Sequence, residues 1–88
     1  MDLSATFRHY CNVIEEYPYK DDFNRQHQED LYGLYKQATI GDAPLYGPTF
    51  LQPKALAKWK AWSTVRGMSS ADAMSGYILT VRRLLPNV

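Results

Sequence analysis

The stretch LYGLYKQATIGD, residues 31–42, has the spacing of an amphipathic helix that stops at a defined point. Leu31, Leu34 and Ala38 recur at intervals of three and four, so they share one face of an α-helix. Gly41 suits the position just after a helix end, because glycine adopts the left-handed conformation that such ends require. The stretch therefore predicts a helix that buries one apolar stripe and ends near Gly41.

The same stretch carries two tyrosines and a lysine along one edge of that stripe. On a helical wheel, Tyr35 lies at the rim of the stripe, and Tyr32 and Lys36 continue around the same side. A buried phenol needs a hydrogen-bond partner. A lysine beside an apolar stripe either extends its ammonium group to water or meets an anion. We interpret these three residues as one contiguous patch that requires explanation.

The region before residue 31 predicts a first helix over about residues 3–16, which Pro18 ends. The polar residues 20–30 hold a turn and then the first turns of the second helix, for which their acidic and amide side chains are suitable. The predicted buried face of the first helix carries Leu3, Phe7, Tyr10, Cys11, Ile14 and Tyr17.

The region after residue 42 predicts two more helices behind a connection rich in glycine and proline. Pro53 suits the first turn of the third helix, which is expected to end at Gly67. Ser69 and Asp72 form a variant capping box that opens the fourth helix, and Pro86 ends it. The predicted buried faces carry Ala55, Trp59, Trp62 and Val65 in the third helix, and Ala73, Met74, Tyr77, Ile78, Val81, Leu84 and Leu85 in the fourth.

This assignment places both tryptophans in the core, so truncating either to alanine is expected to cost about 3–5 kcal/mol of stability. No segment alternates strongly enough to predict a strand. The pattern is all-α, with four helices.

Composition limits the class of protein. With 88 residues, the chain is long enough for one core, and 45% hydrophobic with 22% charged residues is ordinary for a globular domain. A net charge of +1 argues against a duplex-DNA binder. No apolar run is long enough to span a membrane, and the start of the chain resembles neither a signal nor a transit peptide. The single cysteine excludes an internal disulfide, and these features together fit a cytoplasmic protein.

In the second half of the chain, Lys58 and Tyr77 are also polar side chains on predicted apolar helix faces. Lys58 falls within the apolar face of the third helix, whereas Lys60 points to the opposite side, and Tyr77 occupies the middle of the fourth helix's stripe. Ammonium groups from two helices can converge on a phosphate, while phenols donate to it or stack on a base. Taken singly, each tyrosine also fits the rim of a core and each lysine a snorkelling side chain. Spacing alone therefore leaves ligand binding open.

Two long stretches resemble the acyl-CoA-binding protein family: LYGLYKQATIGD at 31–42 and KALAKWKAWSTVRGMSSADAMSGYI at 54–78. The resemblance covers almost the whole chain and is weaker before residue 30 and over 43–53. It implies a four-helix up-down-down-up bundle, with residues 1–88 as a single acyl-CoA-binding domain. It also implies a monomeric intracellular carrier that binds medium- to long-chain acyl-CoA esters without catalysis, metal or cofactor, buffering, protecting and transporting them. Such a carrier has no nucleic-acid partner and no stable membrane insertion.

The resemblance also implies a head-group site made of Tyr32, Tyr35, Lys36, Lys58 and Tyr77. Lys36 and Lys58 with the Tyr32 hydroxyl would hold the ribose 3′-phosphate, and Tyr35 and Tyr77 would flank adenine and ribose. The acyl chain would lie in an apolar groove between helices.

Three departures from the family pattern concern the acyl groove and its entrance. Glu15 stands where many relatives carry a lysine, and residues 26–30 (QHQED) are more polar than the leucine-rich segment usual before the motif. The sequence of the 43–53 connection also differs from the one common in the family. They leave the preferred chain length open, as well as the delivery partner and pathway.

Two other classes of protein compete with this interpretation. An enzyme has little support, because His9 lies opposite the apolar face that carries Cys11, which excludes a nucleophile–base pair within that helix. His27 adds no spacing typical of a metal site. A small helical module for nucleic acid or a protein groove could use the aromatic and basic residues, but the near-neutral charge argues against it.

Overall fold

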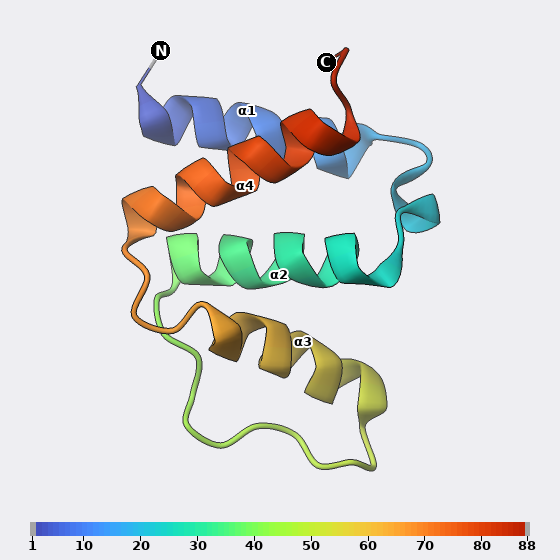
Figure 1. Ribbon diagram of the computed structural model, residues 1–88, viewed down its shortest axis with the longest axis vertical. Coiled ribbons are helices and arrows are strands. Elements are labelled where there is room, and N and C mark those ends of the chain that lie inside the picture. The colour runs from blue at the N-terminus through green and yellow to red at the C-terminus, as the bar shows by residue number, and fades with distance from the viewer. Residues whose placement is uncertain (1, 88) are drawn as a thin grey trace.

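Four α-helices form a row in the computed structural model, which describes residues 2–87. In chain order the elements are α1 (Leu3–Glu16), the short 3-10 helix η1 (Lys20–Asp22), α2 (Arg25–Thr39), α3 (Pro53–Thr64) and α4 (Ser70–Leu84). In space the helices follow the order α1, α4, α2, α3 (Figure 1). The described part of the chain contains no strand, and its smallest extent is 16 Å against 38 Å for its largest. The all-α four-helix prediction is confirmed.

The helix starts follow the capping residues in the sequence. Asp2, Asn24 and Ser69 precede α1, α2 and α4, and each side chain accepts a hydrogen bond from the backbone N–H three residues later, at 2.7, 2.9 and 3.0 Å. These bonds satisfy N–H groups that the first turn of a helix leaves without partners. Pro53 occupies the first turn of α3 instead, where its missing N–H costs nothing. The predicted cap at Ser69 is thus confirmed.

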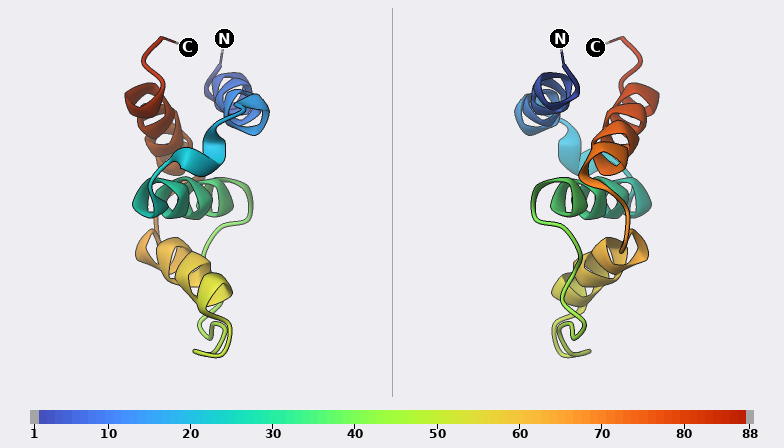
Figure 2. Two further views of the ribbon diagram at one scale, coloured as in Figure 1. Left: turned by 90° about the vertical axis from the view of Figure 1, so that its right-hand side faces the viewer. Right: turned by 90° about the vertical axis from the view of Figure 1, so that its left-hand side faces the viewer.

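The core lies between α1, α4 and α2, which are the first three helices of the row. Its residues come from the predicted stripes and pack together in one cluster: Phe7, Tyr10, Leu31, Leu34, Ala38, Ala73, Tyr77, Ile78, Val81 and Leu85. Val81 and Ala73 are 0% exposed, since α4 packs against both α1 and α2. Figure 2 shows α1 and α4 side by side above α2.

The predicted buried face of α3 is wrong. No residue of α3 is buried: Ala55 is exposed, and Trp59 and Trp62 are only half-buried. The reason is position, because α3 lies at the end of the row and packs mainly against α2 (Figure 1). The closest backbone approach is at Gly33, where an added Cβ would lie 2.7 Å from the Ala61 carbonyl oxygen. The helix also ends at Thr64, three residues before the expected glycine.

The two tryptophans instead fasten the long connection between α2 and α3. The indole N–H of Trp59 donates to the Pro44 carbonyl at 2.9 Å, and that of Trp62 donates to the Gly41 carbonyl at 2.7 Å. At Gly47 the chain runs directly against the Trp59 ring, because an added Cβ would overlap the ring carbons. The connection is therefore irregular but held in place.

The Trp59→Ala variant is expected to lose about 2 kcal/mol of unfolding free energy rather than the 3–5 kcal/mol of a core truncation, because the Trp59 side chain is not fully buried. Urea denaturation monitored by circular dichroism measures this loss. A loss of unfolding free energy of about 4 kcal/mol or more would contradict the half-buried placement of Trp59 and support the buried face of α3 that the sequence predicted.

The QATIGD motif (residues 37–42) takes part in a hydrogen-bond network that the sequence spacing did not predict. Gln37 is 3% exposed, and its amide donates to the Asp42 carboxylate at 2.8 Å and to the Met68 carbonyl at 2.9 Å. The same carboxylate accepts from the Gly67 N–H at 2.8 Å. The Gly67 and Gln37 bonds lower the pKa of Asp42 below its ordinary value. This network ties the end of α2 to the link between α3 and α4.

Candidate functional site

Tyr32, Lys36 and Lys58 come together where α2 faces α3. Tyr32 and Lys36 are one turn apart on α2, and Lys58 reaches the same place from α3. The Nζ atoms of Lys36 and Lys58 lie 5.7 and 5.5 Å from the centroid of the Tyr32 ring. Lys36 Nζ is also 5.6 Å from a Trp62 ring. We call Tyr32, Lys36 and Lys58 the lysine–tyrosine cluster.

The charges of this cluster are not neutralised within the described residues. The one ion pair in residues 2–87 joins Lys20 to Glu15 at 3.6 Å, on another part of the molecule. Two ammonium groups on one aromatic ring repel each other, and cation–π contacts compensate only in part. An anion between them would gain charge-assisted hydrogen bonds from both and relieve the repulsion. The geometry thus suits a phosphate.

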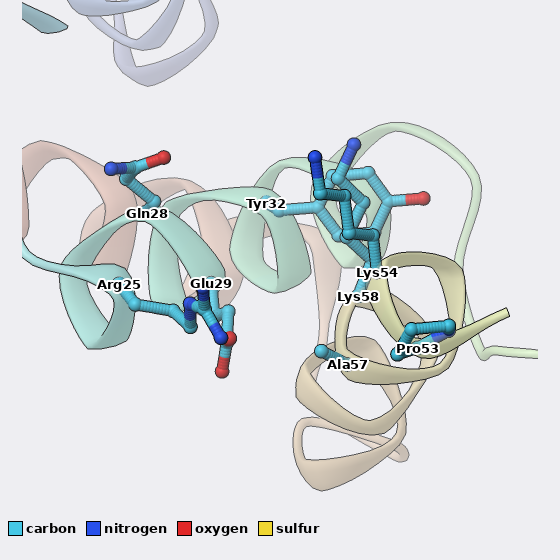
Figure 3. Close-up of a pocket in the computed structure, with 8 residues that line it drawn as sticks. All are labelled: Arg25, Gln28, Glu29, Tyr32, Pro53, Lys54, Ala57 and Lys58. Carbon is cyan, nitrogen blue, oxygen red and sulfur yellow. The ribbon is translucent and has the colours of Figure 1, made fainter. Parts of the chain in front are cut away.

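Two hollows flank the cluster, and both include Tyr32 and Lys58. The larger, of about 690 Å³, lies between α2 and α3. Figure 3 shows its wall from α2, with Arg25, Gln28, Glu29 and Tyr32, facing Pro53, Lys54, Ala57 and Lys58 from α3. The smaller, of about 430 Å³, lies toward the connection and includes Tyr46, Gly47 and Trp59. We call the larger hollow the α2–α3 cleft.

Tyr35 and Tyr77 form a second group, on the side of α2 that faces α1 and α4. Their ring centroids are 6.5 Å apart, and Phe7 contacts both rings, at 6.1 and 5.2 Å. Tyr35 is 43% exposed, whereas Tyr77 is 5% exposed and lies within the core cluster. Neither lines the α2–α3 cleft. The structure therefore separates the five sequence-predicted residues into a group of three and a group of two.

The Tyr77 hydroxyl lies close to the Cys11 thiol of α1. Burial, followed by the neighbouring thiol, raises the pKa of Tyr77 far above its ordinary value. Burial also raises the pKa of the Cys11 thiol. Tyr77 thus stays a neutral phenol, and Cys11 is a packed thiol, as expected from its place on the apolar face of α1. His9 is exposed on the other side of that helix.

The surface of the α2–α3 cleft is mostly apolar, as expected of an acyl groove, but part of its wall is polar. The sequence marked residues 26–30 as unusually polar, and two of them, Gln28 and Glu29, line the cleft. Arg25, which the sequence reasoning missed, lines it as well; its position three and four residues before these two was the available signal. Glu15 has a different place, since it pairs with Lys20 and lines neither hollow.

Two kinds of feature are absent from residues 2–87. No group of three or more His, Cys, Asp or Glu side chains is placed to hold a metal ion in this part of the chain. None of its helices combines the length and the apolar character needed to cross a bilayer.

The fold and the site together define a small helical binding domain that presents cations and aromatic rings beside a cleft. Residues 4–81 match the family model described as "Acyl CoA binding protein". The chain is 39% identical over 85 residues to "Acyl-CoA-binding domain-containing protein 1" of Oryza sativa subsp. japonica, covering 97% of this chain and 91% of that protein. It is 36% identical to an "Acyl-CoA-binding protein" of Ricinus communis, covering 97% and 92%.

A solved structure shows the same fold. The crystal structure of Oryza sativa Acyl-CoA-Binding Protein 2 superposes with a TM-score of 0.88 at 36% identity, covering 96% of this chain and 89% of that one. The chain belongs to the acyl-CoA-binding protein family. The predicted family and its four-helix up-down-down-up bundle are therefore confirmed. Family membership also confirms the prediction of a binding protein rather than an enzyme.

Proposed function

We propose that this chain is a carrier that binds medium- to long-chain acyl-CoA through one domain covering residues 1–88. Membership in the acyl-CoA-binding protein family supports the ligand class. The observation that carries the proposal is the convergence of Lys36 and Lys58 on the Tyr32 ring beside the α2–α3 cleft. A nucleotide that carries both a phosphate and a long apolar tail matches this arrangement.

The lysine–tyrosine cluster holds the 3′-phosphate in this proposal. The two ammonium groups and the Tyr32 hydroxyl donate to phosphate oxygens, and each such charge-assisted bond contributes about 1.5–3 kcal/mol. Tyr35, which is 43% exposed, offers a ring face on which adenine stacks. Tyr77 and Phe7 both pack beside the Tyr35 ring and hold it in place. We thus assign Tyr77 to the edge of the ribose–adenine site.

The acyl tail occupies the α2–α3 cleft and supplies most of the affinity. Each buried methylene contributes about 0.8 kcal/mol, so a long chain supplies around 10 kcal/mol before ordering costs. A thioester held at the cleft is shielded from water, which suits a protein that buffers, protects and transports the ester without reacting with it. The near-neutral net charge argues against a nucleic-acid partner, and we place the carrier in the cytoplasm as a monomer.

The Lys36→Ala variant is expected to bind acyl-CoA about ten- to a hundredfold more weakly, because one charge-assisted bond to the 3′-phosphate is lost. Its affinity for 3′-dephospho-acyl-CoA is expected to stay close to that of the wild type, since that ligand lacks the group that Lys36 contacts. Isothermal titration calorimetry with both ligands measures the two changes.

The Lys60→Ala variant is the matched control, because Lys60 is an exposed lysine of α3 that lines neither hollow. It should bind both ligands as the wild type does. Equal losses for both ligands in Lys36→Ala would contradict the phosphate assignment, even if acyl-CoA binding itself is confirmed.

A further inference from the structure

The connection between α2 and α3 exposes a concentration of large apolar side chains. Nine such side chains are exposed in residues 2–87, and four of them lie within seven residues of this connection. Leu45, Tyr46, Phe50 and Leu51 are 76%, 90%, 81% and 76% exposed. Apolar groups gathered on a surface in this way mark a contact with another apolar phase, whereas isolated ones do not. We call these four residues the apolar tip.

The apolar tip is held outward by the rest of the fold. Besides the Trp59 bond to the Pro44 carbonyl, the guanidinium of Arg66 donates to the carbonyls of Ala43 and Pro44. The Thr49 carbonyl accepts from the Gln52 N–H at 2.9 Å, which closes the turn before α3. These bonds fix the backbone on both sides of the apolar tip. In Figure 1 the connection lies at the end of the long axis opposite both termini, so nothing from the described chain covers it.

The sequence segment that carries the apolar tip is basic, although Glu29 of α2 faces Lys54 across the α2–α3 cleft. No acidic residue occurs between Asp42 and Asp72, and this segment contains four basic residues, among them Lys54 and Lys58 at the start of α3. The rest of the chain has six basic and nine acidic residues. The net charge is near neutral because the basic segment that carries the tip is balanced by the more acidic rest of the chain. An apolar projection surrounded by lysines complements a surface of anionic groups that overlies hydrocarbon.

We propose that the apolar tip and the lysines of α3 dock the domain reversibly on an anionic lipid bilayer. Phe50, Leu51 and Leu45 enter the boundary between headgroups and acyl chains, and Tyr46 lies at headgroup level. The lysines of α3 other than Lys58, which holds the CoA phosphate, pair with lipid phosphates. A second copy of this chain is a poorer partner, because a two-fold contact through the tip brings like charges together. The smaller hollow links Tyr46 to Tyr32 and Lys58. Docking therefore places the proposed binding site next to the membrane surface.

Sedimentation of the full chain with phosphatidylcholine vesicles, with and without phosphatidylserine, tests this proposal. Binding is expected with phosphatidylserine at low salt and is expected to fall as salt screens the lysines. The double variant Phe50→Ser/Leu51→Ser should lower the partition coefficient about tenfold or more. The matched double variant Ile40→Ser/Leu79→Ser removes exposed apolar side chains outside the tip, and it should change the partition coefficient by less than about twofold.

The outcomes distinguish a failure of the docking proposal from a failure of the proposed acyl-CoA binding. None of the four substituted residues lines either hollow, so acyl-CoA affinity in solution should be unchanged in both variants. The docking proposal is overturned if the wild-type protein does not bind phosphatidylserine vesicles, or if both double variants bind them equally well. A wild-type dimer that the Phe50→Ser/Leu51→Ser variant loses, without any vesicle binding, would assign the tip to self-association and also overturn it.

Discussion

Acyl-CoA affinity is expected to rise a little over tenfold for every two carbons added to the acyl chain while the tail is filling the α2–α3 cleft. Each added methylene leaves water for a surface made of Pro53, Ala57 and the side-chain stems of the cleft wall. Free CoA should bind weakly, because it lacks the tail. Palmitate should also bind weakly, because it lacks the phosphate that Lys36 and Lys58 hold.

The rise should stop where the tail reaches the polar wall of the cleft. A methylene placed against Glu29 or Arg25 gains little, since covering a charged group removes water from it at a cost. The Glu29→Leu variant should therefore extend the rise to longer chains. Asp30→Leu is the matched control, because Asp30 is the next residue of α2, lines neither hollow and accepts a hydrogen bond from Gln26.

Calorimetry with octanoyl- to eicosanoyl-CoA, free CoA and palmitate measures this dependence. A flat dependence on chain length, or palmitate binding as well as palmitoyl-CoA, would show that the α2–α3 cleft holds no acyl tail. An equal effect of Glu29→Leu and Asp30→Leu would show that the polar wall does not limit chain length.

The Phe7→Ala variant is expected to lose about 3–5 kcal/mol of unfolding free energy, a large part of what a domain of this size has. Phe7 is 4% exposed and contacts the rings of Tyr35 and Tyr77, so its removal leaves a cavity that these two rings border. Tyr35 also loses its packing partner, so acyl-CoA affinity at a temperature where the variant stays folded should fall as well. Urea denaturation and calorimetry measure the two losses.

Leu79→Ala is the matched control for stability, because Leu79 is a large apolar residue of α4 that is 53% exposed. Its unfolding free energy should change by no more than about 0.5 kcal/mol. Similar losses in Phe7→Ala and Leu79→Ala would contradict the placement of the core between α1, α4 and α2.

The helices themselves were predictable from local pattern. Capping residues such as Asn24 and Ser69 act on backbone groups three positions away, so their effect is already present in a short stretch of chain. The apolar stripes of α1, α2 and α4 likewise predicted the residues of the core, because each of these helices has a neighbour that covers its stripe. Tyr32, Lys36 and Lys58 stood out for the same local reason, as polar groups set against such stripes.

Tertiary structure alone decided which of these stripes is covered and which side chains meet. Periodicity marks a helix face that avoids water, but it carries no information on how many neighbours the helix has. Trp59 is therefore half-buried, because α3 ends the row and only α2 lies beside it. The meeting of Lys36 with Lys58, the polar cleft wall at Arg25 and the exposure of the tip at Phe50 depend in the same way on contacts between helices that are distant in sequence.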